Sequence, residues 1–129
     1  MRRILSIVAL LLTWAGAVSA DPLVGLWASP PDGKGQTGIV HIRPCGTVYC
    51  GTLIKALDPK GREVVTPNVG KRLIWGMRAQ GGGAYDGGRV YVPVFRRDYP
   101  AQLRLSGGQL TVKGCAAGIC KTQHWRRVN

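Results

Sequence analysis

The chain has 129 residues, of which 18 are Lys or Arg and six are Asp or Glu, so its formal net charge at pH 7 is +12. This strongly basic balance predicts attraction to anions such as lipid phosphates or acidic polymers, the alternative being a solvated, solubilising surface. The length allows one domain with a modest core and leaves no room for a second.

Residues 1–20 have the pattern of an export signal. A pair of arginines precedes the apolar run from Ile4 to Trp14, and small residues follow as far as Ala20. These are the charged region, the short apolar region and the cleavage site of a signal peptide. The apolar run is shorter than the roughly 18 to 20 residues that a spanning helix needs. We expect cleavage near Ala20-Asp21 and a periplasmic or secreted domain over residues 21–129 that does not span a membrane.

The four cysteines form two pairs with C-x4-C spacing, and export places them where thiols oxidise. Four cysteines allow three connectivities. Pairing Cys45 with Cys50 and Cys115 with Cys120 is favoured because each pair brackets a short loop that contains glycine. A four-cysteine zinc site is the alternative, but it requires thiolates in a reducing setting and usually C-x2-C spacing. We therefore expect two local disulfides, no metal and no cofactor.

The rest of the chain is divided into short strand-like segments by Gly, Pro, Asp and Asn, and no helical periodicity of useful length is present. The predicted strands are residues 23–28, 37–43, 48–57, 72–79, 89–95, 101–106, 109–115 and 120–128. Residues 58–70 form the longest irregular connection. Connections of this length in a small domain are often functional, and a floppy excursion is the alternative.

A β-hairpin is predicted in the carboxyl-terminal third. Leu103 and Leu105 alternate with polar residues before Gly107-Gly108, and Leu110 and Val112 alternate with polar residues after it. A two-residue turn at the glycines places these four apolar side chains opposite one another on one face. The turn register and the apolar pattern therefore agree, as a hairpin requires.

A local disulfide at the second cysteine pair extends this register into the last strand. Leu110 then faces Trp125, and both Trp125 and Arg127 point toward the core. An inward arginine needs a partner because a buried charge must be paired or stacked. The same counting across the first cysteine pair places His41 opposite Ile54, an apolar mismatch that predicts a bulge.

The sequence Gly25-Leu26-Trp27 resembles the first strand of the calycin superfamily, which includes the lipocalins and in which an Arg from the last strand packs on this Trp. By this resemblance Arg127 covers Trp27. The chain also resembles the bacterial exported family called domain of unknown function 2147, over essentially all of residues 21–129. This resemblance rests on four blocks: Val24–Trp27, Ile42–Gly46 with Cys50-Gly51, Val112–Cys115 with Cys120, and Thr122–Val128. It implies a small antiparallel lipocalin-like β-barrel and no settled activity.

A barrel of about eight strands either fills its interior with side chains or holds one small ligand. We interpret Trp75, Met77 and Trp125 as candidate pocket residues for a small apolar or anionic ligand, and core filling is the alternative. The predicted function is an exported binding or accessory protein of the cell envelope, whose ligand the sequence does not identify.

A second hypothesis is that the basic exterior holds an anionic envelope surface, an anionic polymer or a protein partner. The candidate strip combines cations with aromatic rings and consists of Arg89, Tyr91, Phe95, Arg96, Arg97 and Tyr99. The alternative is that these are ordinary exposed side chains of an edge strand. Such a strip also suits single-stranded nucleic acid, but the export signal argues against that partner.

Enzyme chemistry is disfavoured by the residue inventory, and no catalytic residue is assigned. Neither Ser29 nor Ser106 lies in a Gly-x-Ser-x-Gly nucleophile elbow. The six acids show no paired spacing of the glycosidase type. The two histidines, His41 and His124, are too few and too far apart in sequence for a convincing metal site.

Overall fold

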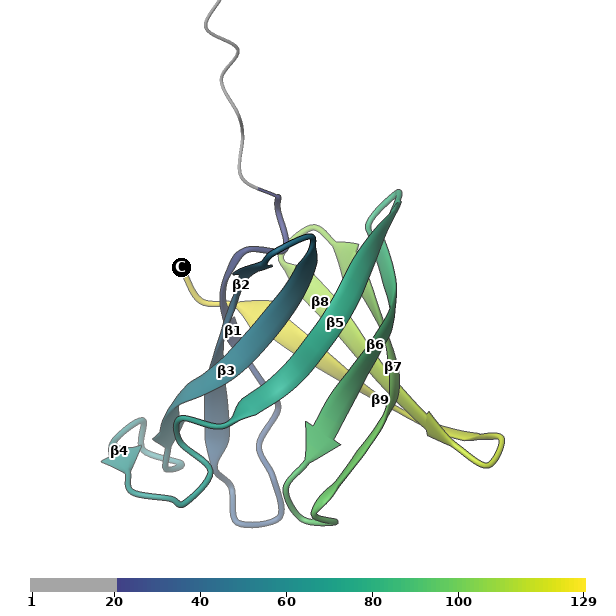
Figure 1. The fold of residues 1–129 in the computed structure, drawn as a ribbon. Helices are drawn as coiled ribbons and strands as arrows, with labels where there is room; N and C mark the ends of the chain where they lie inside the picture. The colour runs from purple at the N-terminus through teal and green to yellow at the C-terminus, as the bar shows by residue number, and fades with distance from the viewer. Residues whose placement is uncertain (1–20) are drawn as a thin grey trace, which may run out of the picture.

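The computed structural model describes residues 21–129, and the predicted export signal over residues 1–20 lies outside this part (Figure 1). The described residues form an all-β structure. Its strands are β1 (Gly25–Ala28), β2 (Thr37–Cys45), β3 (Val48–Leu57), β4 (Glu63–Val64), β5 (Arg72–Gly81), β6 (Ala84–Val92), β7 (Arg97–Ser106), β8 (Gln109–Ala116) and β9 (Ile119–Arg127).

Eight of these strands close into an antiparallel barrel. The hydrogen-bonded order runs β2, β1, β9, β8, β7, β6, β5, β3, and the additional pairing of β2 with β3 completes the ring. The two-residue strand β4 pairs only with the end of β3 and stands outside the ring. Closure satisfies the backbone groups that an open sheet would leave at its edges. The predicted lipocalin-like barrel is confirmed.

The hairpin and the last strand have the predicted register. Leu105 pairs with Leu110, Leu103 pairs with Val112, and Leu110 pairs in turn with Trp125. The two predicted local disulfides, Cys45 with Cys50 and Cys115 with Cys120, are both present. Turn chemistry and alternating polarity were therefore sufficient to define this third of the barrel.

Two details of the prediction were wrong. The predicted strand 89–95 is β6, which begins at Ala84 and ends at Val92. The predicted start follows Gly87-Gly88, but the strand runs through both glycines, and at Gly88 a side chain would collide with the backbone of Trp75 and with Met77 on β5.

The register of the first cysteine pair is the second error. His41 pairs with Thr52 and not with Ile54, because the turn after Cys45 pairs that residue directly with Val48. The bulge expected in this hairpin lies between Ile39 and Val40. It absorbs the register change, so that Val40 and the later apolar residues of β2 keep their side chains inward.

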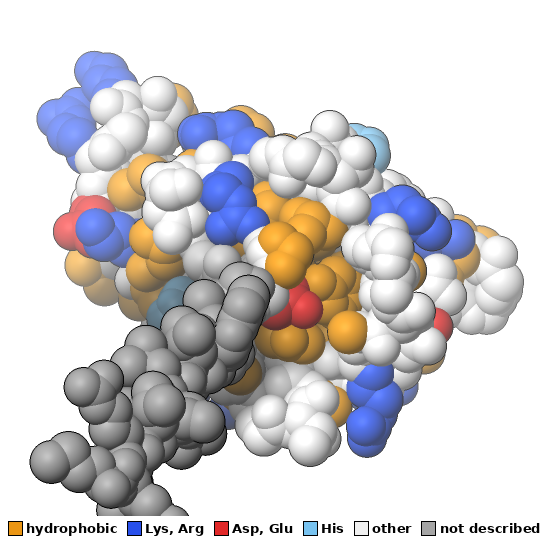
Figure 2. Space-filling view, turned by 90° about the horizontal axis from the view of Figure 1, so that it is seen from above, with side chains coloured by type: hydrophobic (Ala, Val, Ile, Leu, Met, Phe, Trp, Pro, Cys, Tyr) orange, Lys and Arg blue, Asp and Glu red, His pale blue; other side chains and the backbone are white. Residues whose placement is uncertain are grey.

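One end of the barrel is closed by packed side chains and by the segment that precedes β1. Leu23, Trp27, Ile42 and Met77 have no significant exposed surface. The indole Nε1 of Trp27 donates a hydrogen bond of 2.9 Å to the carbonyl of Leu23, which anchors the segment across the barrel end. Figure 2 looks down on this closed end, where hydrophobic side chains surround an acidic group and Lys and Arg lie farther out.

Arg127 secures the seam where the first strand meets the last. β1 and β9 share only two residue pairs, Trp27 with Arg127 and Ala28 with Arg126. The guanidinium of Arg127 lies 4.3 Å from the centroid of the Trp27 ring. It also donates to the carbonyl of Val24 at 3.2 Å and to the carbonyl of Pro22. One side chain thus joins the last strand, the indole and the covering segment.

Asp21 makes a second attachment at the closed end. Its carboxylate accepts a hydrogen bond of 2.5 Å from the hydroxyl of Tyr85 and one of 2.8 Å from the backbone N–H of Leu23. Partial burial acts to raise the pKa of Asp21, but the hydrogen bonds from Tyr85, Leu23 and Tyr49 outweigh it and lower the pKa below its ordinary value.

The substitution Arg127→Leu tests the seam. It removes the cation above Trp27 and leaves two carbonyls without their charged donor, so we expect the free energy of unfolding to fall by about 2 to 4 kcal/mol. Arg126→Leu is the matched control, since Arg126 is exposed, and it should change stability by less than about 0.5 kcal/mol. Urea unfolding of both variants measures the difference, and equal losses would contradict this role of Arg127.

The carboxylate of Asp21 is expected to stabilise the fold in a pH-dependent way. Because its folded-state pKa is lowered, the ionised form stabilises the fold above the ordinary value of 3.8, and this is lost as the pH falls through the folded-state pKa. Asp21→Asn should therefore cost about 1 kcal/mol at neutral pH and progressively less below pH 3.8. Denaturant unfolding at neutral pH and below pH 3.8 measures this loss of stability. Tyr85→Phe is expected to weaken the same pH dependence. A loss that does not vary with pH would refute it.

Candidate functional site

The barrel contains a cavity of about 660 Å³ in the half opposite the closed end. One or more residues of every barrel strand except β1 line it, and the apolar wall is made by Val40, Leu53, Leu73, Val90, Val112 and Trp125. Pairing places these side chains inside, because alternate residues of a strand face the same side of a sheet. The volume lies within the range of small-molecule pockets, roughly 300 to 1,000 Å³.

Glycine allows close packing in two parts of the cavity wall. Gly114 lines the cavity, and a Cβ built on it would lie 3.1 Å from the Cγ1 of Val90. Gly38 on β2 also lines it, and a Cβ there would lie 2.8 Å from the Cδ1 of Leu53. At these positions a larger residue would press against a side chain of the wall.

The mouth of the cavity lies among the connections at the lower end of the barrel in Figure 1. These connections join β1 to β2, β3 to β5, β6 to β7 and β8 to β9. Polar groups gather here and include Ser29, Asp32, Thr66, Asn68, Lys121 and Gln123. The cavity therefore has an apolar interior and a polar rim, the usual form of a small-molecule site.

The interior holds no charge. Among residues 21–129 no polar or charged side chain is buried, and no buried side-chain nitrogen or oxygen lacks a hydrogen-bond partner. The indole Nε1 of Trp125 is satisfied by the Oε1 of Gln123 at 3.0 Å. A charged group in the deep part of the cavity would thus find no partner and would be costly to bury.

The predicted pocket residues Trp75, Met77 and Trp125 lie in three different environments. Trp125 lines the cavity, whereas Trp75 and Met77 do not. Met77 is fully buried in the core. Trp75 pairs with Arg89, next to the inward pair Ile74 and Val90, and alternation places it on the outer face.

A β-bulge in β5 accounts for the position of Trp75. Thr52 pairs with Arg72 while Gly51 pairs with Ile74, so β5 has one extra residue, Leu73, at this point. Leu73 and Ile74 are consequently both buried. This extra residue turns Trp75 outward, and a second register shift, between Tyr49 and Gly51, returns Met77 to the inside.

The predicted exterior strip is also divided. Tyr91, Phe95 and Tyr99 line the cavity, so half of the strip belongs to the inside or to the mouth. Arg89 forms an ion pair with Asp98 on the outer surface. Arg96 and Arg97 are exposed at the β6–β7 turn.

Two wall residues, Val40 and Leu53, were missed by the sequence interpretation. The alternation of Val40 and Ile42 with His41 could have identified the inward face of β2. The aromatic liners Tyr91 and Tyr99 carry no such signal, because their place at the cavity depends on where β6 ends and on its pairing with β7.

The described residues contain no cluster of side chains suited to a metal ion. Within 21–129 no three His, Cys, Asp or Glu side chains come together to hold a metal ion. Asp32, a carboxylate that lines the mouth, accepts the backbone N–H groups of Lys34 and Gln36 and so shapes its own turn. The same part of the chain contains no helix long and apolar enough to cross a membrane.

Comparison with known proteins supports the architecture and leaves the ligand open. No curated protein matches the chain. Among solved structures, HP1028 of Helicobacter pylori, described as belonging to the lipocalin family, is similar with a TM-score of 0.68 over 85% of each chain and 14% sequence identity. At that identity the likeness shows the fold alone. The family model described as "Uncharacterized protein conserved in bacteria (DUF2147)" matches residues 25–127, and the chain belongs to this family.

Proposed function

We propose that this chain is an exported, lipocalin-like binding protein of the bacterial envelope that holds one small, largely apolar molecule in the barrel cavity. The observation that carries the proposal is the cavity of about 660 Å³, walled by apolar side chains and reached through a polar mouth. A barrel of eight strands has an interior of the right size for either a filled core or one small ligand. Here the closed half is filled and the other half is hollow.

The lining defines the chemistry of the ligand. Its body is apolar and uncharged, because the walls present Val, Leu, Tyr and Trp side chains and no charge is buried among them. Its polar or anionic end remains at the mouth, where the amine of Lys121 and the side-chain amides of Asn68 and Gln123 are available. These groups fix the orientation of a bound molecule.

Export is supported by three observations. Residues 1–20 have the sequence pattern of a signal peptide. All four cysteines are paired in disulfides, which persist in oxidising compartments and are rare in a reducing cytosol. The family is bacterial. The periplasm or the outside of the cell is therefore where we place the processed protein.

Blocking the cavity tests the proposal. Val112→Phe adds bulk to an inward residue of the cavity wall, so we expect the affinity for Nile red, a neutral apolar dye, to fall at least about tenfold, equivalent to 1.4 kcal/mol. Dye fluorescence and quenching of tryptophan emission, to which Trp125 contributes from the wall, both report binding. Because the ligand body is uncharged, added salt should change this affinity little.

The matched control is Gln102→Phe, which places the same ring at an exposed position of the neighbouring strand β7. It should bind the dye like the parent protein. Equal binding by both variants, or dye binding that disappears on adding salt, would mean that the cavity is not the site.

A further inference from the structure

The exposed large hydrophobic side chains of residues 21–129 are all on the half of the barrel that carries the mouth. Such side chains are common on protein surfaces when scattered singly, so their confinement to one half is the unusual feature. They lie on the end of β3, on the connection that follows it and on the β6–β7 and β8–β9 turns. They are Ile54, Val65, Val69, Val94, Phe95 and Ile119.

Three of these side chains stand directly at the mouth and will be called the apolar tips: Val94, Phe95 and Ile119. Their exposed fractions are 82, 51 and 71%. The β6–β7 turn that carries the first two is held by backbone hydrogen bonds from Phe95 to Val92 and from Arg96 to Pro93. An ordered turn thus keeps apolar groups in water, where nothing in the described part of the chain covers them.

Cations accompany the apolar tips. The ammonium of Lys121 lies 5.6 Å from the centroid of the Phe95 ring, which brings the β8–β9 hairpin beside the β6–β7 turn. Arg96 follows Phe95 directly and is exposed. Lys71 lies 5.7 Å from the ring of Tyr91 at the edge of the same mouth.

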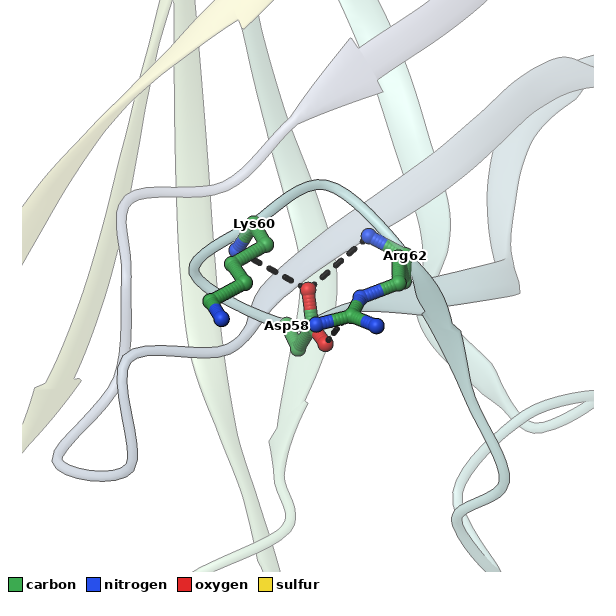
Figure 3. Close-up of polar contacts among 3 residues, drawn as sticks. All are labelled: Asp58, Lys60 and Arg62. Carbon is green, nitrogen blue, oxygen red and sulfur yellow. Dashed lines mark hydrogen bonds and ion pairs between the residues drawn. The ribbon is translucent and has the colours of Figure 1, made fainter.

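Two matched turns present further lysines at this end. Asp32–Gln36 and Asp58–Arg62 share the pattern Asp-x-Lys-Gly-x. In each, the Asp carboxylate accepts the backbone N–H groups of the third and fifth residues, as Figure 3 shows for the second turn. In that turn Asp58 also pairs with the guanidinium of Arg62 at 3.6 Å. Both aspartate carboxylates therefore stabilise their own turns.

The two turns pack against each other. A Cβ built on Gly35 would lie 2.9 Å from the Cγ of Pro59, so only glycine allows this contact without a shift. The contact brings Lys34 and Lys60, the exposed third residues of the two turns, to one side of the mouth. Together with Lys71, Arg96 and Lys121 they make up the basic border of the mouth.

We propose that this mouth docks on an anionic lipid surface, with the apolar tips entering the headgroup region and the basic border contacting lipid phosphates. Protruding apolar side chains flanked by Lys and Arg are the features by which proteins bind at the membrane interface. The tips are single side chains on two turns, and a fluid bilayer can accommodate them without the matching shape that a protein surface would need. The net charge of +12, of which Arg2 and Arg3 in the predicted export signal contribute two, favours the approach.

Docking would turn the open end of the cavity toward the bilayer. An apolar ligand could then pass between membrane and cavity with little exposure to water, whose contact with apolar surface is unfavourable. The docking inference nevertheless stands apart from the proposed function, since it depends on the rim and not on the cavity. The cavity variant Val112→Phe should dock as the parent protein does.

Sedimentation with vesicles tests the docking. The purified protein, exported so that the predicted signal over residues 1–20 is removed, should bind vesicles of phosphatidylglycerol with phosphatidylcholine and should bind pure phosphatidylcholine weakly. Val94→Ser combined with Phe95→Ser should lower partitioning at least about tenfold, because two apolar groups lose their burial. Lys34→Gln combined with Lys60→Gln should lower it by roughly tenfold or more, since each basic residue near such a surface contributes about fivefold.

Arg43→Gln combined with Arg104→Gln is the matched control, because it removes two exposed positive charges from the half that carries the closed end. Its partitioning should fall less than that of the lysine pair. An equal fall, or full retention by the Val94 and Phe95 variant, would show that general basic charge is responsible and would overturn the proposal. Absence of binding to anionic vesicles would do the same.

A second readout locates the contact. Phe95→Trp places an indole at an apolar tip, and its emission should move to shorter wavelength when anionic vesicles are added. An unchanged emission while the protein sediments with the vesicles would mean that another face is bound. Circular dichroism of every variant checks that the barrel is intact.

Discussion

The stacking of Arg127 on Trp27 joins the two ends of the sheet. Only two residue pairs connect β1 with β9, so backbone hydrogen bonds alone make a weak seam. The guanidinium covers the indole at 4.3 Å and binds carbonyls of the segment before β1, which in turn carries Leu23 into the core. A planar group with several donors can contact a ring face and two carbonyls together, which an ammonium cannot do as well.

Closing one end in this way makes the barrel asymmetric. Trp27, Ile42 and Met77 fill the closed half, and the hydrogen bond between Asp21 and Tyr85 attaches the covering segment on the opposite side. Large side chains pack together at the closed end of the barrel. At the other end, valines, leucines and two inward glycines surround an open volume. The position of the cavity is thus a consequence of where the core is filled.

The same asymmetry extends to the surface. The large exposed hydrophobic side chains of residues 21–129 lie on the half with the mouth, where the connections carry the apolar tips with a lysine beside them. Cavity, tips and basic border all lie at one end of the barrel. A binding site for an apolar molecule and a surface suited to anionic lipid would therefore act on the same side of the protein.

The sequence alone was enough to predict the β-class, the two disulfides and the hairpin from Leu103 to Val112. These features follow from alternating polarity, tight glycine turns and cysteine spacing, which depend on neighbours along the chain. The Gly-x-Trp pattern and the inward Arg127 further indicated the lipocalin-like barrel. Only the tertiary structure decided which side chains line the cavity. Trp75 turns outward because the extra residue Leu73 shifts β5 against β3, and β6 passes through Gly88 at a point where the neighbouring β5 leaves no room for a side chain. Bulges and close backbone contacts depend on the partner strand, so no local sequence pattern predicts them.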